Sequence, residues 1–262
     1  LESFWAFGWL LAAIISYFII PEFGWRIALV ISAFPALYAI YLRIKLPDSP
    51  AFSPGKVEKR SIMENLKEVW SKEHARSTVV LWVLWFTVVF SYYGIFLWLP
   101  SVMVMKGFTI VQSFEYVLIM TLAQLPGYYS AAWLIEKMGR KFVLVTYLLG
   151  TAASALVFGN AETIGMLMTS GILLSFFNLG AWGALYAYSP EQYPTVIRGT
   201  GTGMAAAVGR VGGILGPLLV GSMVAAGYSI GVIFTIFCIS IIIGVLTVAF
   251  LGRETRQVEI VQ

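Results

Sequence analysis

Eight long apolar runs, separated by short polar segments, make up most of the chain. They cover residues 3–20, 25–46, 77–104, 113–135, 142–158, 164–188, 199–226 and 230–251. A helix needs about 20 apolar residues to cross the hydrocarbon core of a bilayer, and each run comes close to that length or exceeds it. The pattern therefore predicts an all-α membrane protein with eight transmembrane helices.

The basic residues between these runs gather on one side of the predicted helices. When the connecting segments are assigned alternately to two sides, one side receives 14 of the 17 Lys and Arg residues. The exceptions are Arg26, Lys106 and Arg210. Positive charge is retained in the cytoplasm during insertion, so we expect the basic side and the C-terminus to be cytoplasmic. The expected location is the inner cell membrane, which the chain crosses several times.

The composition narrows the function classes. Hydrophobic residues make up 59% of the chain and charged residues 11%, too apolar a mixture for one soluble core. The net charge of +4 comes from short segments beside the predicted helices, so topology explains it and nucleic-acid binding is not predicted. Asp48, His74 and Cys238 are the single residues of their types and lie far apart. We therefore predict no metal site, no cofactor and no enzyme active site.

One sizeable polar stretch, residues 47–76, divides the chain into two runs before it and six after it. Within it, residues 61–70 carry apolar side chains at helical spacing between Lys and Glu, which predicts a short amphipathic helix on the membrane surface. We expect residues 1–46 to be the last two helices of an N-terminal half and residues 77–262 to be a six-helix C-terminal half. This layout, with Leu1 as the first residue, predicts four further helices ahead of it in the same protein.

Two connecting segments carry a family pattern. Residues 132–141, AWLIEKMGRK, resemble the loop motif small-x-Leu-x-acid-base-x-Gly-Arg-base of the Major Facilitator Superfamily. Ala132 replaces the usual Gly and Glu136 the usual Asp. Residues 190–201, PEQYPTVIRGTG, resemble a loop of its sugar-porter branch, and residues 47–50 and 252–256 are weaker matches to that branch. Because the four matches occur in order, the resemblance covers the whole chain and implies helices five to twelve of a twelve-helix transporter bundle.

The seventh helix of that bundle departs from the sugar porters. Residues 86–100, FTVVFSYYGIFLWLP, offer aromatic side chains where sugar porters carry sugar-binding amides. Residues 90–96, 180–183 and 209–213 are similar to niacin-permease-like transporters, which are metabolite:proton symporters. The resemblance implies a secondary active transporter that moves a small aromatic or heterocyclic acid by alternating access, coupled to protons. The alternatives are a porter of neutral, sugar-like solutes and a non-transporting receptor or channel on the same fold.

Arg210 is the most informative candidate for substrate binding. It lies about eleven residues into its run, close to the bilayer centre, where an unpaired charge is costly. A guanidinium can bind a carboxylate with two parallel donors. The alternative is a structural Arg paired with protein.

The remaining substrate candidates are polar and aromatic side chains on three other helix faces: Gln124 on the first, Asn178 and Trp182 on the second, Trp85 and Tyr92 on the third. Aromatic walls with a few amides suit a flat heterocyclic acid. The alternative is ordinary packing, in which amides join neighbouring helices.

Charged residues at helix ends are the candidates for conformational control: Glu136, Arg140, Glu191 and Arg198. We expect ion pairs that form in one transport state and break in another, and the alternative is that these charges only anchor helix ends at the membrane surface. Glu115 is the one acidic residue that clearly enters a run. It is the candidate proton site, with an interfacial anchor as the alternative.

Overall fold

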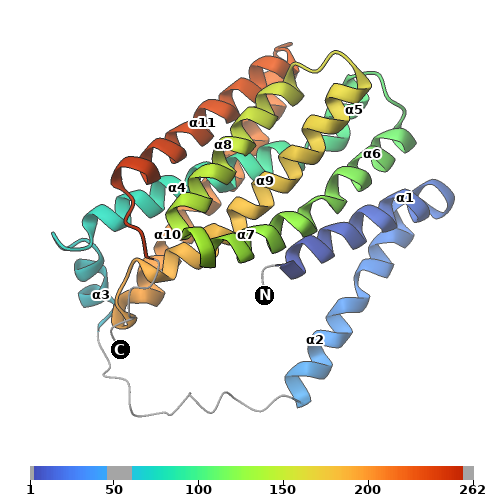
Figure 1. Cartoon of the computed structure of the whole chain (residues 1–262). Coiled ribbons are helices and arrows are strands. Elements are labelled where there is room, and N and C mark those ends of the chain that lie inside the picture. Colours follow the sequence, from blue (N-terminus) through green and yellow to red (C-terminus); the bar gives the residue numbers. More distant parts are fainter. Residues whose placement is uncertain (1–2, 46–60, 256–262) are drawn as a thin grey trace.

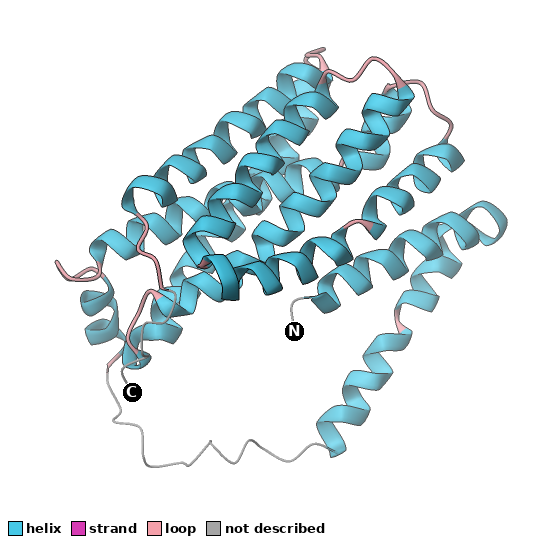
Figure 2. Ribbon diagram, viewed as in Figure 1, coloured by secondary structure: helices cyan, strands magenta, loops and turns pink. Residues whose placement is uncertain are grey.

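A computed structural model describes residues 3–45 and 61–255 of the chain. Within these residues all regular secondary structure is helical, which confirms the all-α prediction (Figure 2). The helices are α1 (Ser3–Ser32), α2 (Phe34–Lys45), α3 (Ile62–Val69), α4 (Ala75–Phe96), α5 (Leu99–Met105), α6 (Ile110–Leu122), α7 (Gln124–Met138), α8 (Arg140–Gly159), α9 (Ile164–Glu191), α10 (Thr195–Ala225) and α11 (Ile230–Leu251).

The long helices after residue 75 pack side by side as one bundle (Figure 1). α4 lies against α10 and α11, α8 lies between α9 and α11, and α7 packs on α9. The α4–α10 contact is very close: a Cβ on Gly216 would overlap the carbonyl oxygen of Phe90. Glycine is therefore required at this crossing, because it lets the two backbones touch.

Six helical segments in the described part of the chain are long and apolar enough to cross a membrane: Phe4–Lys45 taken as one segment, α4, α8, α9, α10 and α11. The predicted run 113–135 does not form one such helix, because α6 ends and α7 begins around Ala123. Pro126 contributes to this break, since it has no N–H to donate to the Leu122 carbonyl four residues earlier. The count of eight spans therefore stays a prediction.

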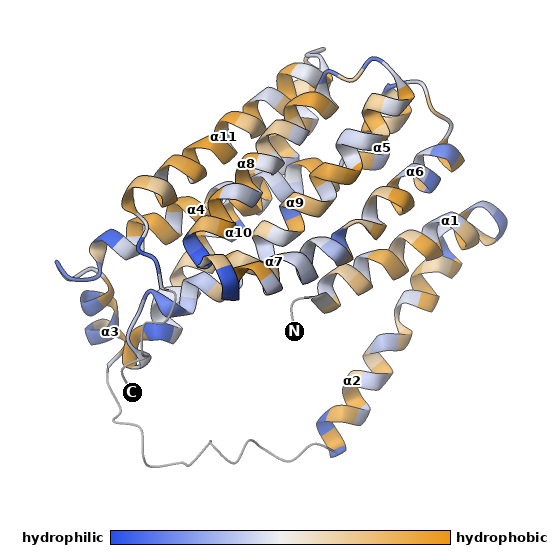
Figure 3. Ribbon diagram, viewed as in Figure 1, coloured by the Kyte–Doolittle hydropathy of each residue, from blue (hydrophilic) through white to orange (hydrophobic). Residues whose placement is uncertain are grey.

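The first helix reverses its direction at Gly24, whose φ of 78° and ψ of 166° lie outside helical values. Figure 1 shows the chain turning back there, so the turn separates the two predicted runs of residues 3–20 and 25–46. α1 lies against α6 and α7. Only 6% of the apolar window in Phe4–Lys45 is buried, against 72% for α4, so this segment exposes a hydrophobic surface (Figure 3).

α3 confirms the short helix expected within residues 61–70. Ser61 Oγ accepts a hydrogen bond from the Met63 N–H (3.3 Å), and Glu64 Oε2 accepts one from the Ser61 N–H (3.0 Å). Ile62 is exposed and Val69 is buried, as in an amphipathic helix. The proposed division at residues 46 and 76 stays a prediction, and most of its polar connection lies outside the described residues.

Candidate functional site

Four aromatic side chains from three helices meet where α1 packs on the bundle, and we call them the aromatic cluster: Trp5 and Trp9 of α1, Tyr92 of α4 and Trp182 of α9. Tyr92 and Trp182 are buried, Trp9 is half-buried and Trp5 is exposed. The ring centres of Tyr92 and Trp182 are 4.9 Å apart. Trp5 lies nearly parallel to Trp182, at 16° and 6.4 Å between centres. Its indole Nε1 donates a hydrogen bond to the Tyr92 hydroxyl (2.9 Å). Two predicted substrate residues are thus in contact.

The sequence interpretation missed Trp5 and Trp9. It drew its candidates from the segment after residue 76, although these two tryptophans lie one helical turn apart on one face of the first run. Trp9 lies 6.4 Å from Tyr92 between ring centres. The aromatic cluster therefore joins the segment 3–45 to the bundle that follows α3.

Arg210 lies beside this cluster, at the middle of α10. Its Nη1 donates a hydrogen bond to the Tyr93 hydroxyl (3.2 Å), and the Tyr93 ring is 5.4 Å from the Tyr92 ring. The Arg210 side chain is exposed in this structure. One aromatic ring thus separates an accessible guanidinium from the aromatic cluster.

Three buried polar side chains lie on the packed helices α7 and α9, and we call them the amide cluster: Gln124, Ser175 and Asn178. Their exposed fractions are 0%, 1% and 1%. Both amide atoms of Gln124, Ser175 Oγ and Asn178 Oδ1 have no hydrogen-bond partner among the described residues. Asn178 lies one turn before Trp182, so the amide cluster borders the aromatic cluster.

The contacts of the residues before and after Gln124 show which part of α9 lies beside it. Before it, Met120 contacts Gly171, and after it, Gly127 contacts Phe176. Gln124 therefore lies beside the part of α9 that carries Ser175.

Trp85 lies nearer the α9–α10 connection than the rest of the candidates. Its Nε1 donates a hydrogen bond to Ser189 Oγ (2.9 Å), and its ring is 5.0 Å from that of Tyr186. Tyr186 in turn lies 6.1 Å from Trp182. Trp85 is thus connected to the aromatic cluster by Tyr186 and borders the cluster on that side.

Three of the four predicted charged residues meet at one end of the bundle. Arg140 Nε lies 3.2 Å from both carboxylate oxygens of Glu191, and Arg140 Nη2 lies 3.0 Å from Glu136 Oε1. Arg198 lies apart, with its Nε donating to the Tyr193 carbonyl (3.4 Å). Burial raises the pKa of the Tyr193 hydroxyl, which donates to Thr78 Oγ1 (2.9 Å).

Glu254, after α11, completes the charged cluster and was missed as a site residue. Its carboxylate accepts hydrogen bonds from the backbone N–H groups of Arg140 (2.9 Å) and Lys141 (3.1 Å) at the start of α8. The preceding residue, Gly139, has a φ of 95° and offers no side chain as a cap. The next residue of the tail, Thr255, donates to Glu191. These contacts join helices within the segment 75–255, so ion pairs that hold the two halves together in one transport state and break in another stay a prediction.

Replacing Glu254 with Gln should lower the melting temperature of the full-length protein. The substitution removes a negative charge from a helix N-terminus and weakens its cap, at a cost of about 0.5–1 kcal/mol. The matched control is Glu162→Gln, in an exposed connection between α8 and α9. Equal melting temperatures for the two variants would remove Glu254 from this role.

Glu115 is exposed at the middle of α6. It lies nine residues, or about two and a half helical turns, before Gln124. The structure therefore does not bring it into the aromatic or amide cluster, and its role in proton coupling stays a prediction.

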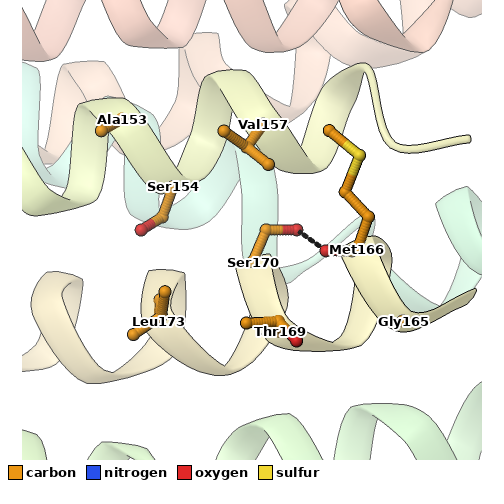
Figure 4. Close-up of a pocket in the computed structure, with 8 residues that line it drawn as sticks. All are labelled: Ala153, Ser154, Val157, Gly165, Met166, Thr169, Ser170 and Leu173. Atoms are coloured by element: carbon orange, nitrogen blue, oxygen red, sulfur yellow. Dashed lines mark hydrogen bonds between the residues drawn. The ribbon is translucent and has the colours of Figure 1, made fainter. Parts of the chain in front are cut away.

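A separate groove of about 430 Å³ lies between α8 and α9 (Figure 4). Its walls are mostly apolar, and the Ser170 hydroxyl in it donates to the Met166 carbonyl (2.6 Å). The lining residues are Ala153, Ser154, Val157, Gly165, Met166, Thr169, Ser170 and Leu173. No predicted substrate residue is among them, so this groove is not the candidate site.

The chain is similar in sequence to proteins named as transporters. The chain is 63% identical over 260 residues to the putative niacin/nicotinamide transporter NiaP of Bacillus subtilis, covering 99% of the chain and 65% of that protein. It is 45% identical over 284 residues to the niacin transporter NiaP of Acinetobacter baylyi, covering 98% and 65%. The chain thus spans about two-thirds of the length of these relatives, which are named as transporters and not as enzymes.

Solved structures share the fold. The D-xylose–proton symporter superposes with a TM-score of 0.73 at 19% identity, covering 95% of the chain and 62% of that protein. The Escherichia coli fucose:proton symporter gives 0.68 at 16% identity, covering 86% and 54%. The family described as the Major Facilitator Superfamily matches residues 1–131 and 116–261. The chain therefore belongs to the Major Facilitator Superfamily and is niacin-permease-like, as its loop motifs and aromatic seventh helix predict.

Proposed function

We propose that this chain is part of a secondary transporter that moves niacin, or a closely similar heteroaromatic acid, by alternating access. The observation that carries the proposal is the aromatic cluster with Arg210 beside it. The names of the two relatives support the choice of substrate.

The ring of such a substrate fits the aromatic cluster chemically. Trp5 and Trp182 are already near-parallel, and a flat heterocycle stacks on such faces with about 0.5–1.5 kcal/mol beyond its area burial. Its carboxylate would bind the Arg210 guanidinium, which offers two parallel donors, with the Tyr93 hydroxyl as a neighbouring donor.

The position of the aromatic cluster supports alternating access. A ligand that contacts Trp5 and Trp182 together touches both segments of the chain, so binding can favour one relative position of these segments. Proton coupling through Glu115 belongs to the same proposal. It predicts that Glu115→Gln keeps niacin binding and loses acceleration of uptake by a pH gradient.

Uptake by cells that make the full-length protein tests this function. We expect saturable accumulation of labelled niacin that excess unlabelled niacin prevents and xylose does not. Competition by xylose but not by niacin would favour the neutral-solute porter. Saturable binding without accumulation would favour a receptor.

The orientation is part of the proposal, with the basic end of the bundle in the cytoplasm. In a Cys238→Ser background, single cysteines at Met138 and Thr195 should be protected from an impermeant thiol reagent added outside intact cells, and one at Asn160 should react. All three positions are exposed in the structure, so access to the reagent decides the result. Outside labelling at Met138 would reverse the orientation.

A further inference from the structure

The amide cluster has no role in binding a carboxylate through Arg210, and it is left without partners. Four side-chain atoms of Gln124, Ser175 and Asn178 are buried and lack hydrogen bonds within residues 3–45 and 61–255. Burying an amide without a partner costs stability, and neighbouring apolar residues would avoid that cost. Unpartnered groups of this kind are expected where a ligand supplies the missing bonds.

The backbone beside Gln124 is also interrupted. α6 ends and α7 begins around Ala123, and Pro126 leaves the Leu122 carbonyl without its usual helical donor. Ala123 itself keeps right-handed helical angles, so the irregularity is local, and the Leu122 carbonyl is the backbone group that it leaves available. The break and the amide cluster are independent observations that indicate the same place.

The chemistry of the amide cluster selects a neutral ligand group. The Gln124 amide offers N–H donors and a carbonyl acceptor, and the Ser175 hydroxyl can donate or accept. Asn178 offers its Oδ1, which has no partner, as an acceptor. α6, α7 and α9 carry four charged residues: Glu115, Glu136, Lys137 and Glu191. Glu115 is exposed at the middle of α6, and the other three lie at the ends of α7 and α9 farthest from Gln124. A carboxylate would find no cation here, whereas a carboxamide presents one acceptor and N–H donors that match the cluster.

We propose that Gln124, Ser175 and Asn178 form a second polar subsite that binds the carboxamide of a neutral heteroaromatic ligand. The inference rests on the proposed function, because the ligand ring would still stack on the aromatic cluster. Arg210 and Tyr93 lie on the α10 and α4 side of that cluster, and Asn178 lies one turn from Trp182 on the α9 side. The acid and its amide would thus stack on the same aromatic rings, with the carboxylate toward Arg210 on α10 and the carboxamide toward the amide cluster on α7 and α9.

Substitution of Gln124 by Leu in the purified full-length protein tests the subsite with niacin and nicotinamide as probes. The melting temperature without ligand should rise, because an unpartnered amide is replaced by an apolar group of similar size. Affinity for nicotinamide should fall about tenfold more than affinity for niacin, because the carboxamide loses one buried hydrogen-bond partner. Asn178→Leu should shift the ratio of the two affinities in the same direction.

Two serines on α9 provide the matched control. Ser175→Ala removes a hydroxyl without a partner, whereas Ser170→Ala removes one that donates to the Met166 carbonyl. The first should lower the ratio of nicotinamide to niacin affinity, and the second should leave that ratio at its original value.

The outcomes separate this inference from the function on which it rests. A lower melting temperature for Gln124→Leu, with equal losses for both probes, would make the cluster a structural contact. A protein that binds niacin and not nicotinamide would overturn the subsite and leave the proposed function standing. A protein that binds neither probe would overturn both.

Discussion

Replacing Arg210 with Ala should lower the affinity of the full-length protein for niacin by about 30-fold or more, since removing one member of a desolvated charge pair costs about 2–5 kcal/mol. Arg210→Lys should also bind niacin more weakly than the original protein, because an ammonium keeps the charge but loses the two parallel donors. Affinity for nicotinamide should fall much less, because the amide carries no charge to pair. Equilibrium binding of both compounds provides the measurement.

Arg26→Ala is the control for this experiment, since it removes an exposed cation that lies over the Trp25 ring, away from the aromatic cluster. It should leave both affinities at their original values. Equal losses of niacin and nicotinamide affinity in Arg210→Ala would show structural damage in place of a lost contact. Full niacin affinity in that variant would favour a neutral solute.

Trp5→Ala should weaken niacin binding by about 10- to 100-fold, because it removes one aromatic wall and about 1.5–3 kcal/mol of apolar burial. Trp5→Phe should recover most of the affinity, since it restores a ring without the indole N–H. Trp25→Ala removes an exposed tryptophan of the same segment and should leave binding unchanged. If Trp5→Ala keeps full affinity, the ligand does not contact the first segment.

The hydrogen bond between Trp5 and Tyr92 can be measured separately with Trp5→Phe, Tyr92→Phe and the double variant. We expect a coupling free energy of about 0.5–1.5 kcal/mol in the melting of the ligand-free protein, the usual value of one such bond. Additive effects would show that the 2.9 Å contact contributes nothing to the joining of the two segments.

The sequence predicted the helical class and most helix positions because apolar runs of this length have few other solutions in a membrane. It predicted one span over residues 113–135, with a bend at Pro126, whereas the structure has two helices that meet around Ala123. A proline in an apolar run can bend a helix or end it, and hydropathy alone does not distinguish the two results. The turn at Gly24 was implied by the break between two apolar runs at residues 21–24, and the non-helical backbone at Gly24 agrees with it.

The candidate site was predicted in part. Tyr92 and Trp182 could be named because they lie in runs that resemble a transporter family, and the contacts of Arg140 with Glu136 and Glu191 follow from helix ends that carry opposite charges. The contribution of Trp5 could not be found in the same way. Which tryptophan of an apolar helix faces a distant helix depends on how the two segments cross, and helical spacing gives only the face that they share.

The contact of Glu254 with the start of α8 has a consequence for the order in which the protein is made. The two partners, Arg140 and Glu254, are separated by 114 positions, so the ribosome completes α8, α9, α10 and α11 before the residue that caps α8 exists. Until then the N–H groups of Arg140 and Lys141 can bond only to water at the membrane surface. The capping of α8 by Glu254 is therefore a late event of synthesis. A chain cut after Leu251 would keep its membrane helices but would leave the N–H groups of Arg140 and Lys141 without this cap.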